Sequence, residues 1–228
     1  MFHGAKCLDR DTVVFFHENA GNIGVRLDYF EMLFKRVNVN VLCVGYRGYG
    51  HSEGTPSEVG LQQDAKSIIK FIQTSPKVNQ SRLFLIGRAL GGAVALSLLN
   101  EMKESSILKG VIIESAFTNS QDVSDILFPF LKLLGPLRSM VIKNRWNNLE
   151  QVKTVTCPIL FISGDKDQLV PVEMTKRLHS ACASQRKEVW IVAGGNHNNT
   201  FSVGGSIYVT KLQSFFWKCR SIKQSTPT

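Results

Sequence analysis

The sequence predicts an α/β fold with a mostly parallel sheet flanked by helices. Short apolar runs rich in β-branched residues alternate along the 228 residues with longer stretches of helical periodicity. Because the short runs are apolar almost throughout, rather than at every second position, we expect strands that are buried on both faces. Strand–helix alternation of this kind is typical of a parallel sheet covered by helices on both sides.

The expected elements follow one another in a regular order. Strands are expected at 12–16, 39–44, 82–86, 111–113, 158–162 and 188–192, and helices at about 24–36, 57–74, 91–102, 172–183 and 206–220. We interpret the whole chain, 1–228, as one domain, because this length favours a single substantial core.

The alternation breaks between residues 118 and 148. This segment is apolar but contains Pro129 and Pro136, and prolines disfavour one long helix. We expect a small helical cap insertion. The segment can be interpreted as a packed helical insertion or as a cap over a site. The two interpretations are compatible, because a packed insertion can also cover a site. The apolar side chains that we expect to line an acyl pocket there are Phe128, Phe130, Leu131 and Leu134.

Composition narrows the classes of function. The net charge of +9 suits an anionic membrane surface or an acidic substrate, whereas no dense Lys/Arg tract or motif indicates nucleic acid. Five scattered cysteines without a C-x-x-C pair indicate an intracellular, reducing compartment with neither disulfides nor zinc. We find no signal peptide and no span-length apolar segment, so we expect a soluble chain. A further N-terminal segment would supply a membrane anchor.

The segment from Leu83 to Ala95 indicates a nucleophile elbow. A buried strand leads into Gly87-Arg-Ala-Leu-Gly91 and then into a helix of small residues, which is the context of the G-x-S-x-G motif. The spacing of the two glycines alone is also compatible with an ordinary tight turn. In this elbow, alanine (Ala89) occupies the position of the nucleophilic serine.

Two further residues follow in the order expected for this chemistry. Asp167 comes after the strand at 158–162, and His197 lies in the loop after the last strand. Elbow, acid and histidine in this chain order are typical of an α/β-hydrolase fold. Taken singly, the aspartate resembles a turn residue and the histidine an ordinary surface residue.

The loop after the first strand, His17-Glu-Asn-Ala-Gly-Asn-Ile23, is the candidate for one half of an oxyanion hole. We assign its N–H donor to Asn19 and the second donor to Leu90, directly after the elbow. No metal or nucleotide cofactor is expected. The glycine-rich segment 46–50 lacks both G-x-G-x-x-G and the P-loop lysine, and His51 has no second histidine at metal-ligand spacing.

Five segments together resemble the eukaryotic α/β-hydrolase domain-containing protein 13 group. They are His17-Glu-Asn-Ala-Gly-Asn-Ile-Gly24, Tyr46-Arg-Gly-Tyr-Gly-His-Ser-Glu-Gly54, Gly87-Arg-Ala-Leu-Gly-Gly-Ala-Val-Ala95, Ser163-Gly-Asp-Lys-Asp-Gln-Leu-Val-Pro171 and Gly195-Asn-His-Asn-Asn-Thr200. The resemblance covers nearly the whole chain. It implies a serine hydrolase for a small-molecule or protein-linked acyl substrate, in a group usually tethered to a membrane by an N-terminal segment.

The sequence departs from the group's pattern at several positions. Ala89 replaces serine, Glu18 replaces the glycine after the histidine, and Gly45 and Asn199 replace aspartates. A carboxylate at Glu18 would oppose an oxyanion. The strands that normally precede the first one also have no counterpart, so we expect a sheet that is short at one edge. Ala89 alone suggests an engineered change that prevents turnover, whereas the other three changes point towards a naturally degenerate lineage.

Three hypotheses of function follow. The first is a scaffold for acyl-ester or thioester hydrolysis that Ala89 makes inactive, with peptide hydrolysis ranked lower. The second is a non-catalytic pseudohydrolase that holds a lipid or a protein partner. The third is a basic module that binds a membrane surface.

Overall fold

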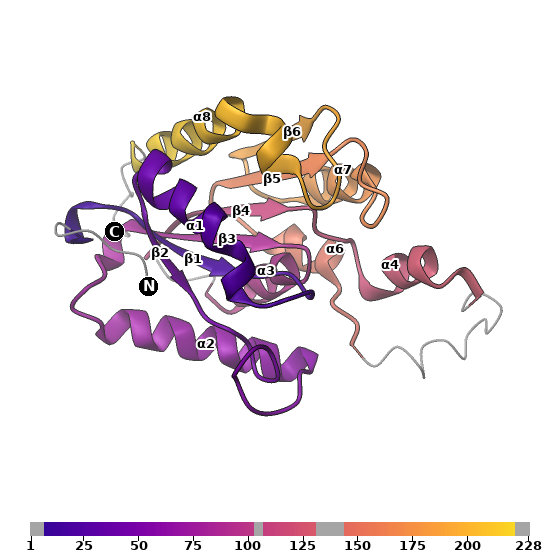
Figure 1. Ribbon diagram of the computed structural model, residues 1–228, viewed down its shortest axis with the longest axis horizontal. Helices are drawn as coiled ribbons and strands as arrows, with labels where there is room; N and C mark the ends of the chain where they lie inside the picture. Colours follow the sequence, from indigo (N-terminus) through magenta and orange to yellow (C-terminus); the bar gives the residue numbers. More distant parts are fainter. Residues whose placement is uncertain (1–6, 103–106, 131–143, 222–228) are drawn as a thin grey trace.

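The computed structural model describes residues 7–102, 107–130 and 144–221. Its centre is a six-stranded parallel sheet with the strand order β2-β1-β3-β4-β5-β6 (Figure 1). The strands are β1 (Thr12–Phe16), β2 (Asn40–Cys43), β3 (Leu83–Arg88), β4 (Leu108–Glu114), β5 (Ile159–Gly164) and β6 (Lys187–Val192). The α/β class and the parallel sheet that the sequence predicts are confirmed.

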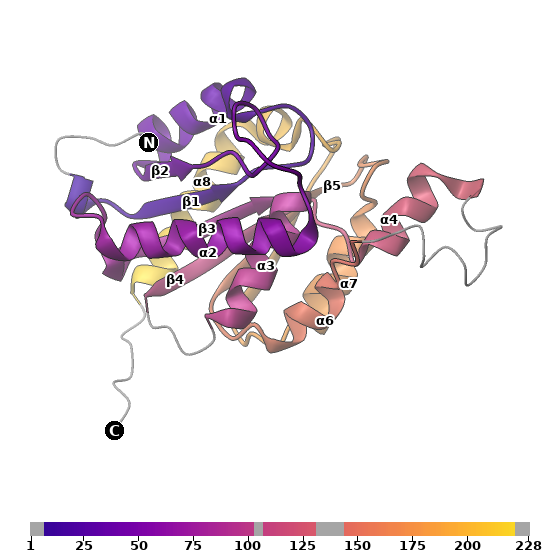
Figure 2. The same cartoon turned by 90° about the horizontal axis from the view of Figure 1, so that it is seen from below.

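Helices cover both faces of the sheet. The helices are α1 (Leu27–Met32), α2 (Glu58–Thr74), α3 (Leu90–Glu101), α4 (Ser120–Leu127), α6 (Asn148–Gln151), α7 (Val172–Ala181) and α8 (Thr200–Arg220). One face carries α1 and α8, and the other carries α2, α3, α6 and α7 (Figures 1 and 2). This three-layer arrangement buries the inner strands on both sides, whereas the edge strand β6 is only partly buried.

The sheet divides its side chains between two hydrophobic cores. Along β3, Leu83 and Leu85 join the core under α2 and α3, whereas Phe84 and Ile86 join the core under α1 and α8. All four side chains are 0% exposed. Successive side chains of a strand point to opposite faces, so one short run of sequence supplies both cores.

The segment after β1 differs from the single helix expected at 24–36. It is a 3-10 turn (Ile23–Arg26), then α1, then a π-helical turn (Leu33–Val37) that ends at Asn38 with φ of 66°. The last helix, α8, begins at Thr200, but its backbone is kinked at Gly205, where φ is 50°, a conformation that glycine adopts without strain. The stretch after this kink coincides with the helix expected at 206–220.

The described part of the cap contains α4, which stands out from the body of the molecule (Figures 1 and 2). The helix begins after Asn119, whose side chain accepts a hydrogen bond from the backbone N–H of Asp122 at 2.7 Å. Leu131 and Leu134 lie outside the described residues.

The strand order places the site. All six strands are parallel, so their carboxyl ends meet at one edge of the sheet. The order reverses between β1 and β3, since the chain passes from β1 outwards to β2 and then returns to the other side of β1. Open α/β sheets bind ligands outside the carboxyl ends of the strands at such a switch point.

Candidate functional site

The turn between β3 and α3 holds Ala89 in a conformation that few residues adopt. Its φ of 49° and ψ of −113° place the Cβ on a sharp bend. Its N–H donates to the carbonyl of Glu114 at 2.9 Å, and its carbonyl accepts from Gly92 at 3.0 Å. These backbone bonds hold the bend, and the methyl group of Ala89 faces a cavity.

Two glycines make this bend possible. A Cβ on Gly87 would lie 2.4 Å from the carbonyl oxygen of Gly91. A Cβ on Gly91 would lie 1.9 Å from the carbonyl oxygen of Phe16, at the end of β1. The first turn of α3 therefore packs directly on the neighbouring strand, and the loop after β1 is brought beside position 89.

His197 and Asp167 form a hydrogen-bonded pair beside the elbow. His197 lies in the loop between β6 and α8, and its Nδ1 is 2.8 Å from Oδ2 of Asp167. The other carboxylate oxygen of Asp167 accepts the N–H groups of Leu169 and Val170 at 3.0 and 2.8 Å. Asp167 is 5% exposed. With its carboxylate fixed in this way, Asp167 can hold the imidazole in one orientation, with Nε2 towards the cavity.

The loop after β1 is held by two tyrosines of the segment after β2. The ring of Tyr46 stacks on His17 with centroids 4.1 Å apart, and its hydroxyl donates to the carbonyl of His17 at 3.1 Å. Tyr49 donates to Oδ1 of Asn19 at 2.5 Å. Asn19 and Leu90 line the same cavity as Ala89. Burial lowers the pKa of His17, and its Nδ1 is 2.8 Å from the carbonyl oxygen of Glu18.

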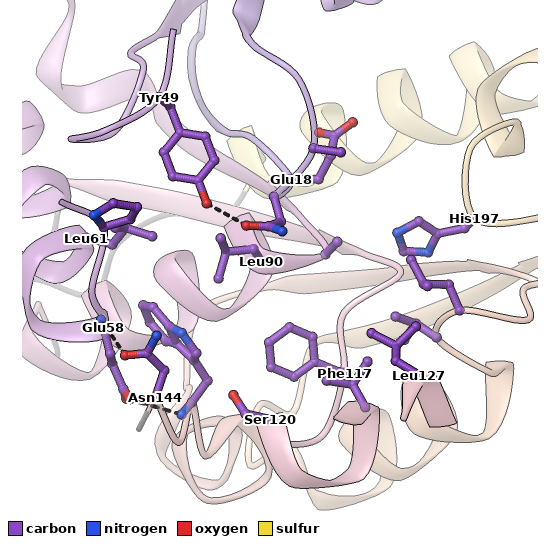
Figure 3. Close-up of a pocket in the computed structure, with 18 of the residues that line it drawn as sticks. Glu18, Tyr49, Glu58, Leu61, Leu90, Phe117, Ser120, Leu127, Asn144 and His197 are labelled. Atoms are coloured by element: carbon purple, nitrogen blue, oxygen red, sulfur yellow. Dashed lines mark hydrogen bonds between the residues drawn. The ribbon is translucent and has the colours of Figure 1, made fainter. Parts of the chain in front are cut away.

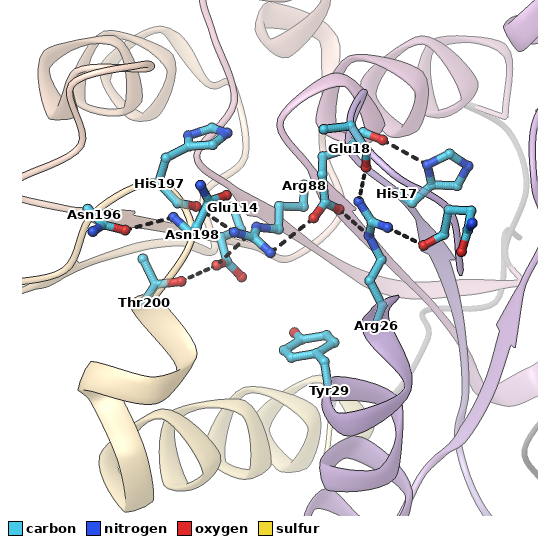
Figure 4. Close-up of polar contacts among 12 residues, drawn as sticks. His17, Glu18, Arg26, Tyr29, Arg88, Glu114, Asn196, His197, Asn198 and Thr200 are labelled. Atoms are coloured by element: carbon cyan, nitrogen blue, oxygen red, sulfur yellow. Dashed lines mark hydrogen bonds and ion pairs between the residues drawn. The ribbon is translucent and has the colours of Figure 1, made fainter. Parts of the chain in front are cut away.

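A buried network of charges lies behind this loop (Figure 4). Glu18 pairs with Nε of Arg26 at 2.7 Å and with Nη1 of Arg88 at 3.2 Å. Arg88 also donates to the carbonyl of His197 at 2.5 Å, and its Nε is 3.8 Å from Glu114. Glu114 accepts hydrogen bonds from the hydroxyls of Thr200 and Tyr208. Two carboxylates face two guanidiniums, so the network is close to neutral.

The sequence suggested that Glu18 would place an opposing charge at the oxyanion hole, and the structure shows that this charge is balanced. Burial raises the pKa of Glu18, but the hydrogen bond from Arg26 and the charge of Arg88 outweigh burial and leave the pKa below its usual value. The carboxylate is therefore ionised at neutral pH and is paired with both guanidiniums.

A cavity of about 760 Å³ opens at the elbow. In Figure 3, His197 lies at one end of this cavity, and Glu58, Leu61 and Asn144 lie at the other. Most of its lining is apolar, and the apolar lining side chains include Leu61, Leu90, Phe117, Val123, Leu127, Phe128, Trp146, Leu169 and Val170. An apolar cavity of this size with a few convergent polar groups is typical of a small-molecule site.

Of the side chains expected to line an acyl pocket, Phe128 lies in the wall. Phe130 is not part of the cavity lining; its side chain is 63% exposed and its ring lies 6.1 Å from that of Phe128. Phe117 and Trp146 were not anticipated from the sequence. Phe117 follows the carboxyl end of β4, a position that could have indicated it, whereas no local pattern identifies Trp146.

Arg88 was also missed as a site residue, although it occupies the second position of the elbow motif. Nothing in the motif shows where its long side chain goes. Among the described residues, no three His, Cys, Asp or Glu side chains gather as metal ligands would. Within the same ranges, the helices all fall short of the length and apolarity that crossing a membrane demands.

Comparisons with known proteins agree with this arrangement. The family model described as serine aminopeptidase, S33, matches residues 9–149. The α/β hydrolase domain-containing protein WAV2 of Arabidopsis thaliana is 33% identical, over 89% of this chain and 68% of its own length. Protein bem46 of Schizosaccharomyces pombe is 32% identical, over 84% of this chain and 62% of its own length. This chain thus spans about two thirds of these relatives.

Solved structures share the fold at lower sequence identity. The Pyrococcus furiosus esterase Pf2001 superposes with a TM-score of 0.73 at 21% identity, over 92% of this chain and 83% of its own. A Paleococcus ferrophilus monoacylglycerol lipase superposes with a TM-score of 0.67 at 18% identity, over 91% and 94% of the two chains. The family match, the relatives and the fold agree, and the chain belongs to the α/β-hydrolase superfamily.

Proposed function

We propose that this chain is a serine-hydrolase scaffold for acyl esters or thioesters, and that Ala89 blocks its turnover. The observation that supports the proposal most strongly is the placement of Ala89. It occupies a strained strand-to-helix bend and shares an apolar cavity with a histidine that is hydrogen-bonded to a buried aspartate. The apolar lining favours an acyl chain over a short polar ester.

The roles of the residues follow from where they lie. With serine at position 89, Nε2 of His197 would take the hydroxyl proton as the oxygen attacks the acyl carbon, and Asp167 would stabilise the imidazolium. The N–H groups of Leu90 and Asn19 would bind the developing oxyanion. The imidazolium would then protonate the leaving oxygen or sulfur, and a water molecule would release the acyl group by the same route.

Alanine removes the atom that forms the covalent bond. In comparable triads, loss of the nucleophile lowers kcat by about a millionfold. We therefore expect this chain to be nearly inactive on esters, with only the residual catalysis that an oxyanion hole and substrate binding provide.

The test is an Ala89→Ser variant, treated with a fluorophosphonate probe and assayed on p-nitrophenyl esters of increasing chain length. We expect only the serine-containing protein to be labelled and to hydrolyse the esters. Ala89→Ser/His197→Ala is the matched control, because it keeps the hydroxyl and removes the base. A folded Ala89→Ser protein that neither labels nor hydrolyses would contradict the proposal.

As a second proposal, we infer that this chain binds a membrane surface and that its substrate lies there. The end of α4 and the residues after it expose Ile126, Leu127, Phe128 and Phe130 at 38, 45, 49 and 63%, and the chain has a net charge of +9. We expect Phe130→Ser to weaken binding to vesicles that contain anionic lipid, and salt to weaken the electrostatic part. Sedimentation with vesicles measures both effects, and binding that neither change alters would contradict this second proposal.

A further inference from the structure

The Nε2 atom of the His197 ring faces the cavity and has no hydrogen-bond partner among the residues that the structure describes. His197 is 8% exposed, and its Nδ1 is committed to Asp167 at 2.8 Å. Its Nε2 would contact a serine hydroxyl, but the side chain of Ala89 is a methyl group. A ring nitrogen that faces the cavity without a partner among these residues can form a hydrogen bond with a ligand there.

The backbone N–H of Leu90 is a second polar group at the same end of the cavity. Leu90 is the first residue of α3, a helix of 12 residues, and it lines the cavity beside Ala89. The first N–H groups of a helix have no partner within the helix, and the helix dipole adds partial positive charge there. This end of the cavity therefore offers an N–H donor and an imidazole on either side of the place that a serine hydroxyl would occupy.

Apart from Asp167, whose carboxylate is bonded to Nδ1 of His197, the surrounding charges do not repel an anion from this position. Glu18, the carboxylate of the cavity wall nearest to the elbow, is paired with Arg26 and Arg88 at 2.7 and 3.2 Å. Glu58 lies at the opposite end of the cavity (Figure 3), where it accepts the backbone N–H groups of Arg145 and Trp146. Between the two ends the wall is apolar, with Phe117, Leu127 and Val170 among its side chains.

We propose that this chain, as an alanine protein, binds a medium- or long-chain carboxylic acid. One carboxyl oxygen accepts the N–H of Leu90, the other shares a proton with Nε2 of His197, and the alkyl chain lies along the apolar cavity. This binding is distinct from the proposed hydrolysis, because it needs no nucleophile. It assigns the alanine protein a ligand of its own.

The test is calorimetric titration of the Ala89 protein with decanoate and with 1-decanol, which share an alkyl chain and differ in the head group. A charge-assisted hydrogen bond supports at least about tenfold tighter binding of the acid. We expect His197→Ala to remove this preference, so that the variant binds the two ligands with equal affinity, and His197→Gln to weaken it. The control is His51→Ala, which changes an exposed histidine that does not line the cavity. It should bind both ligands as the unchanged protein does.

The outcomes separate this inference from the hydrolase proposal. Equal affinity for decanoate and decanol would overturn the carboxylate site. No binding of either ligand by the folded protein would overturn it as well, together with the apolar acyl pocket. If Ala89→Ser reacts with the fluorophosphonate probe while the alanine protein shows no preference for the acid, hydrolysis stands and this inference fails. If the alanine protein prefers the acid while the serine variant stays unreactive, the carboxylate site stands and the hydrolase proposal fails.

Discussion

At position 89 the backbone adopts the strained bend that is typical of a nucleophile elbow, although the alanine there has no nucleophilic hydroxyl group. A conformation of this kind costs on the order of 1–3 kcal/mol and persists only where the surroundings impose it. Here the surroundings are the backbone bond from Ala89 to Glu114 and the close approach of Gly91 to Phe16. The bend therefore depends on packing and backbone hydrogen bonds rather than on the identity of the side chain.

Gly91→Ala tests that packing. The added Cβ would lie 1.9 Å from the carbonyl oxygen of Phe16, so α3 must move away from β1. We expect a loss of more than about 3 kcal/mol in the free energy of unfolding, measured by urea denaturation. The control is Gly45→Ala, whose Cβ would meet its nearest neighbours at 3.5 Å, an ordinary contact. Equal stability of the two variants would show that α3 is not pressed against β1.

Glu18→Gln tests the buried ion pairs. Removing one charge leaves Arg26 and Arg88 without a counter-charge on this side, so we expect a loss of about 3 kcal/mol near pH 7. The pKa of Glu18 is lowered in the folded state, so its contribution is present above the unfolded value of about 4.5 and is lost as the pH falls through the folded value.

The stabilities of the unchanged protein and Glu18→Gln should therefore converge as the pH falls below about 4.5, and urea denaturation at several pH values measures this. Glu173→Gln is the control, because its ion pair with Lys176 is exposed and contributes little. A stability difference between the unchanged protein and Glu18→Gln that is constant with pH would show that the charge of Glu18 is not the cause.

Among the elements, the N-terminus of α2 is joined to the chain that returns from the cap. Glu58 accepts the N–H groups of Arg145 and Trp146 at 2.6 and 3.2 Å, and its own N–H donates to Asn144 at 3.0 Å. Trp146 is 3% exposed and has a φ of 37°. These contacts fix one wall of the cavity to the body of the protein.

Glu58→Ala should loosen this junction. Loss of the carboxylate leaves the N–H of the buried Trp146 without its acceptor, at a cost of about 1–3 kcal/mol, whereas the exposed Arg145 can bond to water instead. We expect the amides of Arg145 and Trp146 to exchange hydrogen at least tenfold faster, measured by amide exchange. The control is Glu150→Ala, which removes a nearby but exposed ion pair with Lys153. If both variants exchange at the same rate, the junction does not depend on Glu58.

The elements also show which parts of the fold local sequence determines. The strands could be predicted to within a few residues, because runs buried on both faces leave a strong local signal. The helix expected at 24–36 divides into 3-10, α and π turns. The helix expected at 206–220 matches the part of α8 after the kink at Gly205, and the turn that precedes it from Thr200 was not expected. Periodicity does not report such changes in backbone conformation.

At the scale of the whole molecule, four of the site residues proposed from sequence motifs, Asn19, Ala89, Leu90 and His197, line one cavity, because their motifs follow the carboxyl ends of strands. The sequence did not predict the partners of Arg88 or the place of Trp146. Those depend on contacts between segments far apart in the chain, such as Arg88 with the carbonyl of His197 and Trp146 with Glu58. The intervening fold must be known before such pairs can be assigned.

The rate at which a reagent modifies the five free cysteines measures how readily the whole fold opens. Burial raises the pKa of Cys43, Cys157 and Cys219 to about 12. At pH 8 their thiolate populations are on the order of a thousandfold smaller than in an unfolded chain, so iodoacetamide should modify them slowly until urea unfolds the protein. Mass spectrometry of the labelled peptides measures this. Rapid labelling of all three thiols under native conditions would show that the cores open readily.

The pairing of β1 with β3 also bears on how the protein folds. Thr12 lies opposite Leu83, and β2 and α2 are formed by the chain between these strands. Contacts between residues so far apart in sequence close late, since a long loop must be ordered before they form. The bend at Ala89 lies at the end of this pairing and rests on β1. We therefore expect it to be among the last parts to assemble, so that refolding should restore helical structure before it restores the site.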